Sequence, residues 1–185
     1  MWRKVVVTLF ALSIGVLAVP MQTVGAVRQG SLKVTAYQLG WDDSFSPGPS
    51  DTRWIAMASR SPVCFQGLMT SLDYTWEWGD VLGGTCLDEY VALHITGALH
   101  IPAAGNYTFY SATDDGFRLI VGRQTVINDW ELQGMDLFNS QGSVRLNRQS
   151  YQIDIWFMEN WGGAGLELFY SRNGSVAAIV PNFRF

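Results

Sequence analysis

Two adjacent carboxylates, Asp114 and Asp115, followed by Gly116, are the residues best suited to chemistry in this sequence. Neighbouring carboxylates repel one another unless a cation, an arginine or a proton lies between them. With no Cys or His close by, their hard oxygen donors suit Ca²⁺ better than Zn²⁺. Asp-Asp-Gly is also an ordinary turn sequence, in which side-chain oxygens cap nearby backbone. Taken alone, these residues favour the turn, and a calcium site is the alternative.

Motifs of common enzymes are absent from the sequence. It holds no His-Glu-x-x-His pattern and no nucleophile elbow, and the glycines at 162, 163 and 165 lack the lysine of a phosphate-binding loop. Two carboxylates on one turn cannot readily flank a glycosidic bond, which requires a separation of about 5 Å or more. An enzyme is therefore the least favoured class.

The elements that must position Asp114 and Asp115 are β-strands, because apolar residues recur with a period of two. Alternating segments occupy 91–95, 99–101, 107–111, 118–121, 125–127, 141–146, 151–157 and 166–170. Turn signals separate them every eight to twelve residues or so, among them a tight hairpin at Gly122 to Gln124. This pattern predicts an all-β fold, an antiparallel sandwich or barrel.

Other segments alternate weakly. Residues 41–84 are predicted to form long loops around short strands, and 130–137 to contain at most one helical turn. His94 and His100 occupy the polar face of the alternating segments, so we expect partly covered strand residues and not metal ligands.

The first residues resemble a secretory signal. Arg3 and Lys4 precede an uncharged run from Val5 to Val19, and small residues follow at 24–26. The run is shorter than the roughly 20 residues that cross a bilayer. We expect cleavage after residue 26, a single secreted or cell-surface domain over 27–185, and no membrane insertion after the signal is removed.

Secretion decides how the two cysteines are interpreted. Cys64 and Cys86 lie 22 positions apart, and an oxidising compartment favours a disulfide between them. A catalytic cysteine acting with His94 or His100 is the alternative, and no local motif supports it.

Charge and composition exclude other partners. Ten basic and sixteen acidic residues remain without the signal, so the net charge is 10 − 16 = −6. The basic residues are scattered, which is not the footprint of a nucleic-acid-binding surface. With 48% hydrophobic and 15% charged residues, the chain has enough apolar material for a core.

Several motifs together resemble the PA14 domain family. They are the strand 105–113 leading into Asp114-Asp115-Gly116, the Arg118-Leu119 that follows, and the Val126-Ile127-Asn128-Asp129-Trp130 return, with further matches at 73–79, 151–166 and 179–183. The resemblance extends from about Leu32 to the end of the chain. Departures at Gly122-Arg123 and Arg148-Gln149 affect turns only.

The resemblance implies a β-sandwich or barrel-like domain. In sugar-binding members the paired aspartates are joined by a cis peptide bond and hold Ca²⁺, which coordinates sugar hydroxyls. Carried over to this chain, Asp114 and Asp115 match the metal-binding pair and Asn160 matches a ligand from a second loop. Trp161 would stack on a sugar ring, with Gly162 beside it in the ligand site. Burial under a hairpin is the alternative for Trp161, but its place after a strand end and before two glycines favours exposure.

The remaining aromatic residues have structural interpretations. We expect Trp130, Trp156, Tyr107 and Phe109 to pack in the interior. At least one of Trp76 and Trp78 should also be core, whereas Trp41 and Trp54 are expected at a rim near the site.

Two functions follow from the sequence. The first is a secreted, calcium-dependent, lectin-like domain that binds a glycan in adhesion or glycan recognition. The second is a non-enzymatic assembly component of an extracellular or cell-surface complex that recognises a protein.

Overall fold

The computed structural model describes residues 32–40, 52–78, 81–87, 89–180 and 183–184. The expected signal, residues 1–26, and Trp41 lie outside these ranges. Within them, no helix has the length and apolar character needed to span a membrane.

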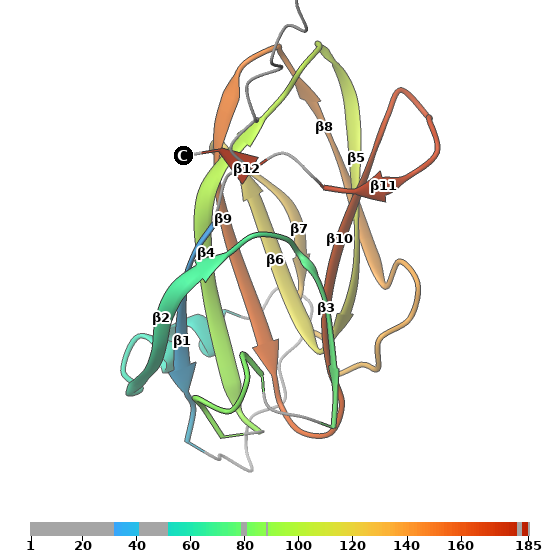
Figure 1. Cartoon of the computed structure of the whole chain (residues 1–185). Helices are drawn as coiled ribbons and strands as arrows, with labels where there is room; N and C mark the ends of the chain where they lie inside the picture. The colour runs from blue at the N-terminus through green and yellow to red at the C-terminus, as the bar shows by residue number, and fades with distance from the viewer. Residues whose placement is uncertain (1–31, 41–51, 79–80, 88, 181–182, 185) are drawn as a thin grey trace, which may run out of the picture.

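Strands dominate the described chain (Figure 1). The first half contains β1 (Leu32–Gln38), α1 (Arg53–Ala58), β2 (Val63–Met69), β3 (Asp73–Glu77), β4 (Val91–His100) and β5 (Gly105–Asp114). The second half contains β6 (Gly116–Val121), β7 (Gln124–Asp129), β8 (Ser140–Leu146), β9 (Ser150–Glu159), β10 (Ala164–Arg172), β11 (Ala178–Ile179) and β12 (Phe183–Arg184).

These strands form two sheets, and every described strand pair is antiparallel. In the described residues the larger sheet has the order β2-β1-β4-β9-β6-β7, with β12 also paired to β4. The smaller sheet has the order β11-β10-β5-β8, with β3 also paired to β10. The predicted all-β antiparallel sandwich is therefore confirmed, as is the two-residue hairpin turn at Gly122 and Arg123.

The main core lies between the sheets because alternate residues of each strand point inward. On β9 the inward residues are Ile153, Ile155 and Phe157, each at most 2% exposed. Tyr107 and Phe109 of β5 face them from the smaller sheet and are equally buried. The expected interior positions of these two aromatic residues are confirmed.

A second apolar cluster covers the outer face of the larger sheet. Trp54 and Ala58, four residues apart and so on one side of α1, belong to a buried cluster with Trp130, Trp156 and others. The buried positions of Trp130 and Trp156 were predicted. The rim position expected for Trp54 is wrong, because this residue is only 2% exposed and lies on the buried side of α1.

Helix content differs from the prediction in two places. The stretch expected to be loops around short strands contains α1 as well as β2 and β3. Residues 130–137 form no helical turn, and a turn occurs instead at 137–138. A six-residue helix carries too little periodicity to be distinguished from a loop in the sequence.

A disulfide joins Cys64 of β2 to Cys86, with Cα atoms 5.2 Å apart, as predicted. It ties the edge strand of the larger sheet to the segment that enters β4. Within that segment, the backbone N–H of Leu87 donates a 2.6 Å hydrogen bond to Oε1 of Gln38 on β1.

Candidate functional site

Asp114 and Asp115 lie where the chain crosses from one sheet to the other. Asp114 is the last residue of β5 in the smaller sheet, and Gly116 begins β6 in the larger sheet. The peptide bond between the two aspartates is cis, as the resemblance implied. A side chain at Gly116 would meet Met158 Cε at 3.2 Å and the Trp130 backbone at 3.3 Å, so glycine permits this close crossing.

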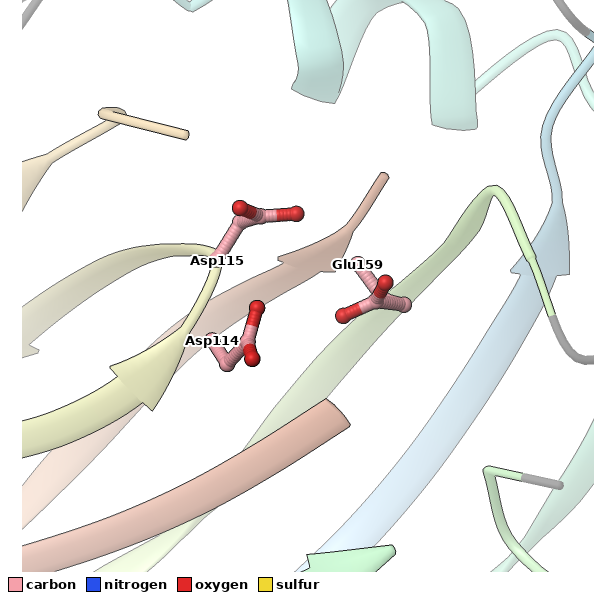
Figure 2. A group of neighbouring side chains, drawn as sticks. All are labelled: Asp114, Asp115 and Glu159. Carbon is pink, nitrogen blue, oxygen red and sulfur yellow. The ribbon is translucent and has the colours of Figure 1, made fainter. Parts of the chain in front are cut away.

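Glu159 completes an acidic cluster with these aspartates (Figure 2). One carboxylate oxygen from each of the three residues lies within 4.8 Å of the other two. The β6–β9 ladder pairs Phe117 with Phe157 and Gly116 with Met158, so Asp115 and Glu159 are next in the same register. The antiparallel pairing therefore brings their side chains to one end of the sandwich.

Backbone donors fix the aspartates. The N–H of Gln133 donates to Oδ1 of Asp115 and the N–H of Asn160 to Oδ2, both at 2.8 Å. Asp114 accepts a backbone hydrogen bond from Met135. Glu159 is different, because its side chain is fully buried and neither oxygen has a hydrogen-bond partner among the described residues.

Burial raises the pKa of all three acids. Burial, and then the charges of Asp115, Asp114 and Glu89, raise the pKa of Glu159 to about 9. Burial is also the main cause that raises the pKa of Asp115 to about 7, against the backbone hydrogen bonds from Asn160 and Gln133. The pKa of Asp114 is raised by burial as well. The side-chain charges that contribute to these shifts are those of other carboxylates, and each raises the pKa further.

The donor set fits a hard divalent cation. Three carboxylates supply oxygen ligands, which Ca²⁺ prefers, and no His or Cys of the described chain joins the cluster, as Zn²⁺ would favour. A buried carboxylate without a partner is costly unless a proton or a cation neutralises it. Asp114, Asp115 and Glu159 would hold such an ion.

The loop after β9 lies directly against this cluster. Asn160 contacts it through its backbone, since its N–H donates to Asp115 while its carbonyl accepts a 2.9 Å hydrogen bond from Tyr90. The N–H of Gly162 donates to Oε2 of Glu89 at 2.9 Å. The structure thus brings Asp114, Asp115, Asn160 and Gly162 to one end of the molecule.

Two tryptophans are exposed at this end. Trp161 has an exposed fraction of 68%, which agrees with the exposure expected from its place between a strand and two glycines. Trp78, just after β3, is 82% exposed, whereas Trp76 packs against the core with its ring 5.9 Å from that of Phe157. The expectation that at least one of Trp76 and Trp78 is core is therefore confirmed.

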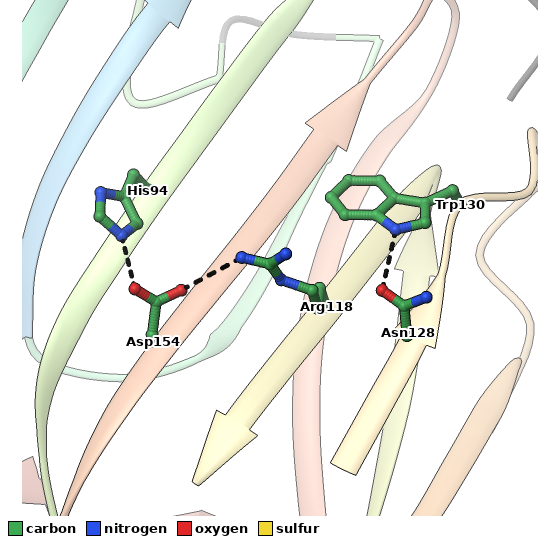
Figure 3. A network of polar contacts seen from close by, with 5 residues as sticks. All are labelled: His94, Arg118, Asn128, Trp130 and Asp154. Atoms are coloured by element: carbon green, nitrogen blue, oxygen red, sulfur yellow. Dashed lines mark hydrogen bonds and ion pairs between the residues drawn. The ribbon is translucent and has the colours of Figure 1, made fainter. Parts of the chain in front are cut away.

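A second polar group lies on the outer face of the larger sheet (Figure 3). Nε2 of His94 lies 3.0 Å from Oδ2 of Asp154, and Nη2 of Arg118 lies 3.7 Å from Oδ1. The His94 ring stacks on Trp156 at 4.3 Å between centroids. His94 is thus a partly covered strand residue, as predicted. The group links side chains of three neighbouring strands, β4, β9 and β6.

Sequence reasoning missed Glu159 and Glu89. A signal for Glu159 was present, because it continues the apolar stripe of β9, Ile153, Ile155 and Phe157, by one more alternate position. A carboxylate in that register predicts a buried charge. Nothing in the sequence around Glu89 indicates its bond to Gly162, since 73 positions separate the two residues.

Comparisons with known proteins agree with this fold. The family model described as PA14 domain matches residues 79–172. The anti-sigma-I factor RsgI3 of Acetivibrio thermocellus is 26% identical over 111 residues, which are 60% of this chain and 17% of that protein. The chain therefore spans less than a fifth of the length of this curated relative.

Solved structures show the same fold at low identity. A PA14 sugar-binding domain from an RTX adhesin is 20% identical with a TM-score of 0.67, covering 81% of this chain and 94% of that one. The epithelial adhesin 9 A domain of Candida glabrata, in complex with Galβ1-3GlcNAc, is 8% identical with a TM-score of 0.64, covering 84% and 88%. With the family model matching half of its residues and the sandwich shared with these domains, this chain belongs to the PA14 domain family.

Proposed function

We propose that this protein is a secreted, calcium-dependent carbohydrate-binding domain that acts in extracellular adhesion or glycan recognition. The observation that carries the proposal is the cluster of Asp114, Asp115 and Glu159, in which a fully buried carboxylate has no partner in the described chain. A Ca²⁺ ion there would neutralise the acids and present open coordination positions to sugar hydroxyls.

The surroundings of the cluster support a sugar as the ligand. The exposed ring of Trp161 lies one residue from Asn160, whose N–H bonds to Asp115, so apolar and coordinating surfaces adjoin. A saccharide offers hydroxyls to the ion and C–H groups to an indole. Sugar-binding domains of the same family share the fold.

Calcium binding is tested by thermal unfolding. Millimolar Ca²⁺ should raise the Tm of the wild-type protein after treatment with EDTA, and Asp114→Asn with Asp115→Asn should abolish that rise. Glu159→Gln should abolish it too. Asp73→Asn, which alters an exposed carboxylate on β3, is the matched control and should keep the full shift. If Ca²⁺ does not change the Tm of the wild-type protein, the calcium proposal is refuted.

Sugar binding and secretion need separate measurements. A glycan array probed with and without EDTA should give signals only when Ca²⁺ is present. Mass spectrometry of the protein expressed with residues 1–26 should find the N-terminus at residue 27. The disulfide supports secretion, because such bonds persist in oxidising compartments.

Protein recognition in an assembly is the second candidate, and no enzymatic activity is proposed. An aromatic group on the smaller sheet favours this candidate: the Phe138 ring lies 4.7 Å from Tyr110 and 5.4 Å from Phe169, next to Leu137, which is 73% exposed. Exposed apolar side chains of this kind form protein interfaces. A stable oligomer in light scattering together with a blank glycan array would favour it over the lectin.

A further inference from the structure

Trp78 is an exposed aromatic residue that the proposed site does not use. It follows β3 directly, and β3 pairs Glu77 with Ala164, the first residue of β10. β10 also pairs Gly165 with Asp114. Trp78 therefore lies at the same end of the sandwich as the acidic cluster, with 82% of its surface exposed. β3 and β9 both end at the lower side of Figure 1.

The indole of Trp78 lies against the loop that carries Trp161. A Cβ atom built on Gly162 would be 3.9 Å from Cζ3 of Trp78. Gly162 has φ of 108°, a conformation that a residue with a side chain rarely adopts. The positive φ is what requires glycine here, because 3.9 Å is an ordinary van der Waals distance, and the indole thus contacts the backbone one residue beyond Trp161.

Hydrogen bonds hold this loop at both ends. Asn160 is attached to Asp115 and Gly162 to Glu89, at 2.8 and 2.9 Å. Consecutive Cα atoms are about 3.8 Å apart, so Asn160 and Gly162 are separated by at most roughly 7.6 Å. The backbone of Trp161 therefore lies between Asn160, which is bonded to the acidic cluster, and Gly162, which lies next to Trp78.

We propose that Trp78 is a second saccharide-contacting residue, so that the preferred ligand contains at least two linked pyranose units. This inference rests on the proposed function. The first sugar is held at the cation through its hydroxyls and contacts Trp161, and the next extends over Trp78. Rigid indoles supply large contact areas at low entropic cost, which suits them to the apolar faces of sugar rings.

Matched saccharides test this arrangement in the presence of Ca²⁺. Titration calorimetry compares methyl β-galactoside with lactose, and methyl β-glucoside with cellobiose, on the wild type and on Trp78→Ala. The substitution should weaken disaccharide binding by about fivefold or more and leave monosaccharide binding within about twofold. Trp161→Ala should weaken both. Val176→Ala, which truncates an exposed side chain following the opposite end of β10, should change neither.

The outcomes separate this inference from the function on which it rests. If the wild type binds a disaccharide and Trp78→Ala binds it equally well, or loses both ligands equally, the role of Trp78 is refuted while the lectin proposal stands. If the wild type binds none of the saccharides with Ca²⁺ present, both are refuted. An unchanged Tm of Trp78→Ala verifies that the variant is folded, as expected for so exposed a side chain.

Discussion

Glu159 places a carboxylate where the alternation of β9 calls for an apolar side chain. It is fully buried, its oxygens have no partner within the described chain, and three other carboxylates raise its pKa further. Without a cation, protons must neutralise much of this cluster. The residue is thus costly for the fold and useful for ion binding, which is typical of functional sites.

The acidic cluster predicts an unusual pH dependence. In the unfolded chain the pKa is near 3.8 for Asp115 and near 4.5 for Glu159. In the folded protein the pKa rises to about 7 for Asp115 and to about 9 for Glu159. The folded state therefore binds more protons, and in EDTA its stability should fall as the pH rises from about 4 to about 9. Ca²⁺ should raise the Tm more at pH 8 than at pH 5. Thermal unfolding across this range measures both effects, and an equal calcium shift at the two pH values would contradict the expectation.

At the scale of the elements, three neighbouring strands of the larger sheet are linked by side chains on their outer face. His94 of β4, Asp154 of β9 and Arg118 of β6 form this link. The hydrogen bond from His94 is the largest cause that lowers the pKa of Asp154. A lowered carboxyl pKa means that the folded state favours the charged form.

Replacing Asp154 by Asn should therefore destabilise the protein in a pH-dependent way. The stabilisation from Asp154 is present above its unfolded pKa of 3.8 and is lost as the pH falls through the lower folded value. At pH 7 the loss should be below about 1 kcal/mol, because more than a third of this side chain is exposed. Denaturant titrations at pH 7 and at the lowest pH where both proteins fold give the comparison. A difference that does not shrink on acidification would argue against this interpretation.

Trp54 is a buried residue of helix α1 and packs in the apolar cluster on the outer face of the larger sheet. Truncation of this buried indole to Ala should lower the free energy of unfolding by about 3–5 kcal/mol, through lost burial and the cavity left behind. The same truncation at Trp161, which is 68% exposed, should change stability by about 0.5 kcal/mol or less. Urea unfolding of the two variants provides the measurement. Comparable losses would show that Trp161 packs more tightly than its exposure implies.

At the scale of the whole molecule, the site is formed where the two sheets meet. Asp114 is the last residue of β5 in the smaller sheet, and Glu159 is the last residue of β9 in the larger sheet. Asp115 lies between β5 and β6, where the chain passes from one sheet to the other. The disulfide holds the segment leading to Glu89, and Glu89 holds the loop of Trp161. The packing of the two sheets therefore positions the acidic cluster, and the disulfide helps to position the neighbouring loop at the same end of the sandwich.

Removal of the disulfide should destabilise the whole molecule. Cys64→Ser with Cys86→Ser opens a loop whose ends are 22 positions apart, which in the chain-entropy model costs about 3 kcal/mol. For a chain of this size the Tm should fall by about 6–12 °C. Calorimetry of the variant beside the wild type measures the change. An unaltered Tm would mean that the packing of β2 and the segment before β4 alone constrains this region.

The fold class and part of the site follow from local patterns in the sequence. Period-two alternation assigns residues to faces, which predicted the sandwich and the buried positions of Tyr107, Phe109 and Trp156. Turn chemistry placed the hairpin at Gly122, and it placed Trp161 in an exposed loop. These features depend on neighbouring residues, so they can be deduced without knowledge of the tertiary structure.

Long-range pairing decided the rest. The approach of Glu159 to Asp115 depends on the register of β6 and β9, and that of Trp78 to Gly162 on the pairing of β3 with β10. The burial of Trp54 depends on α1 docking on the outer face. The sequence by itself determined which residues alternate, turn and carry charge. Only the tertiary structure decided which of them meet, because contacts between residues distant in the chain are set by sheet order and register.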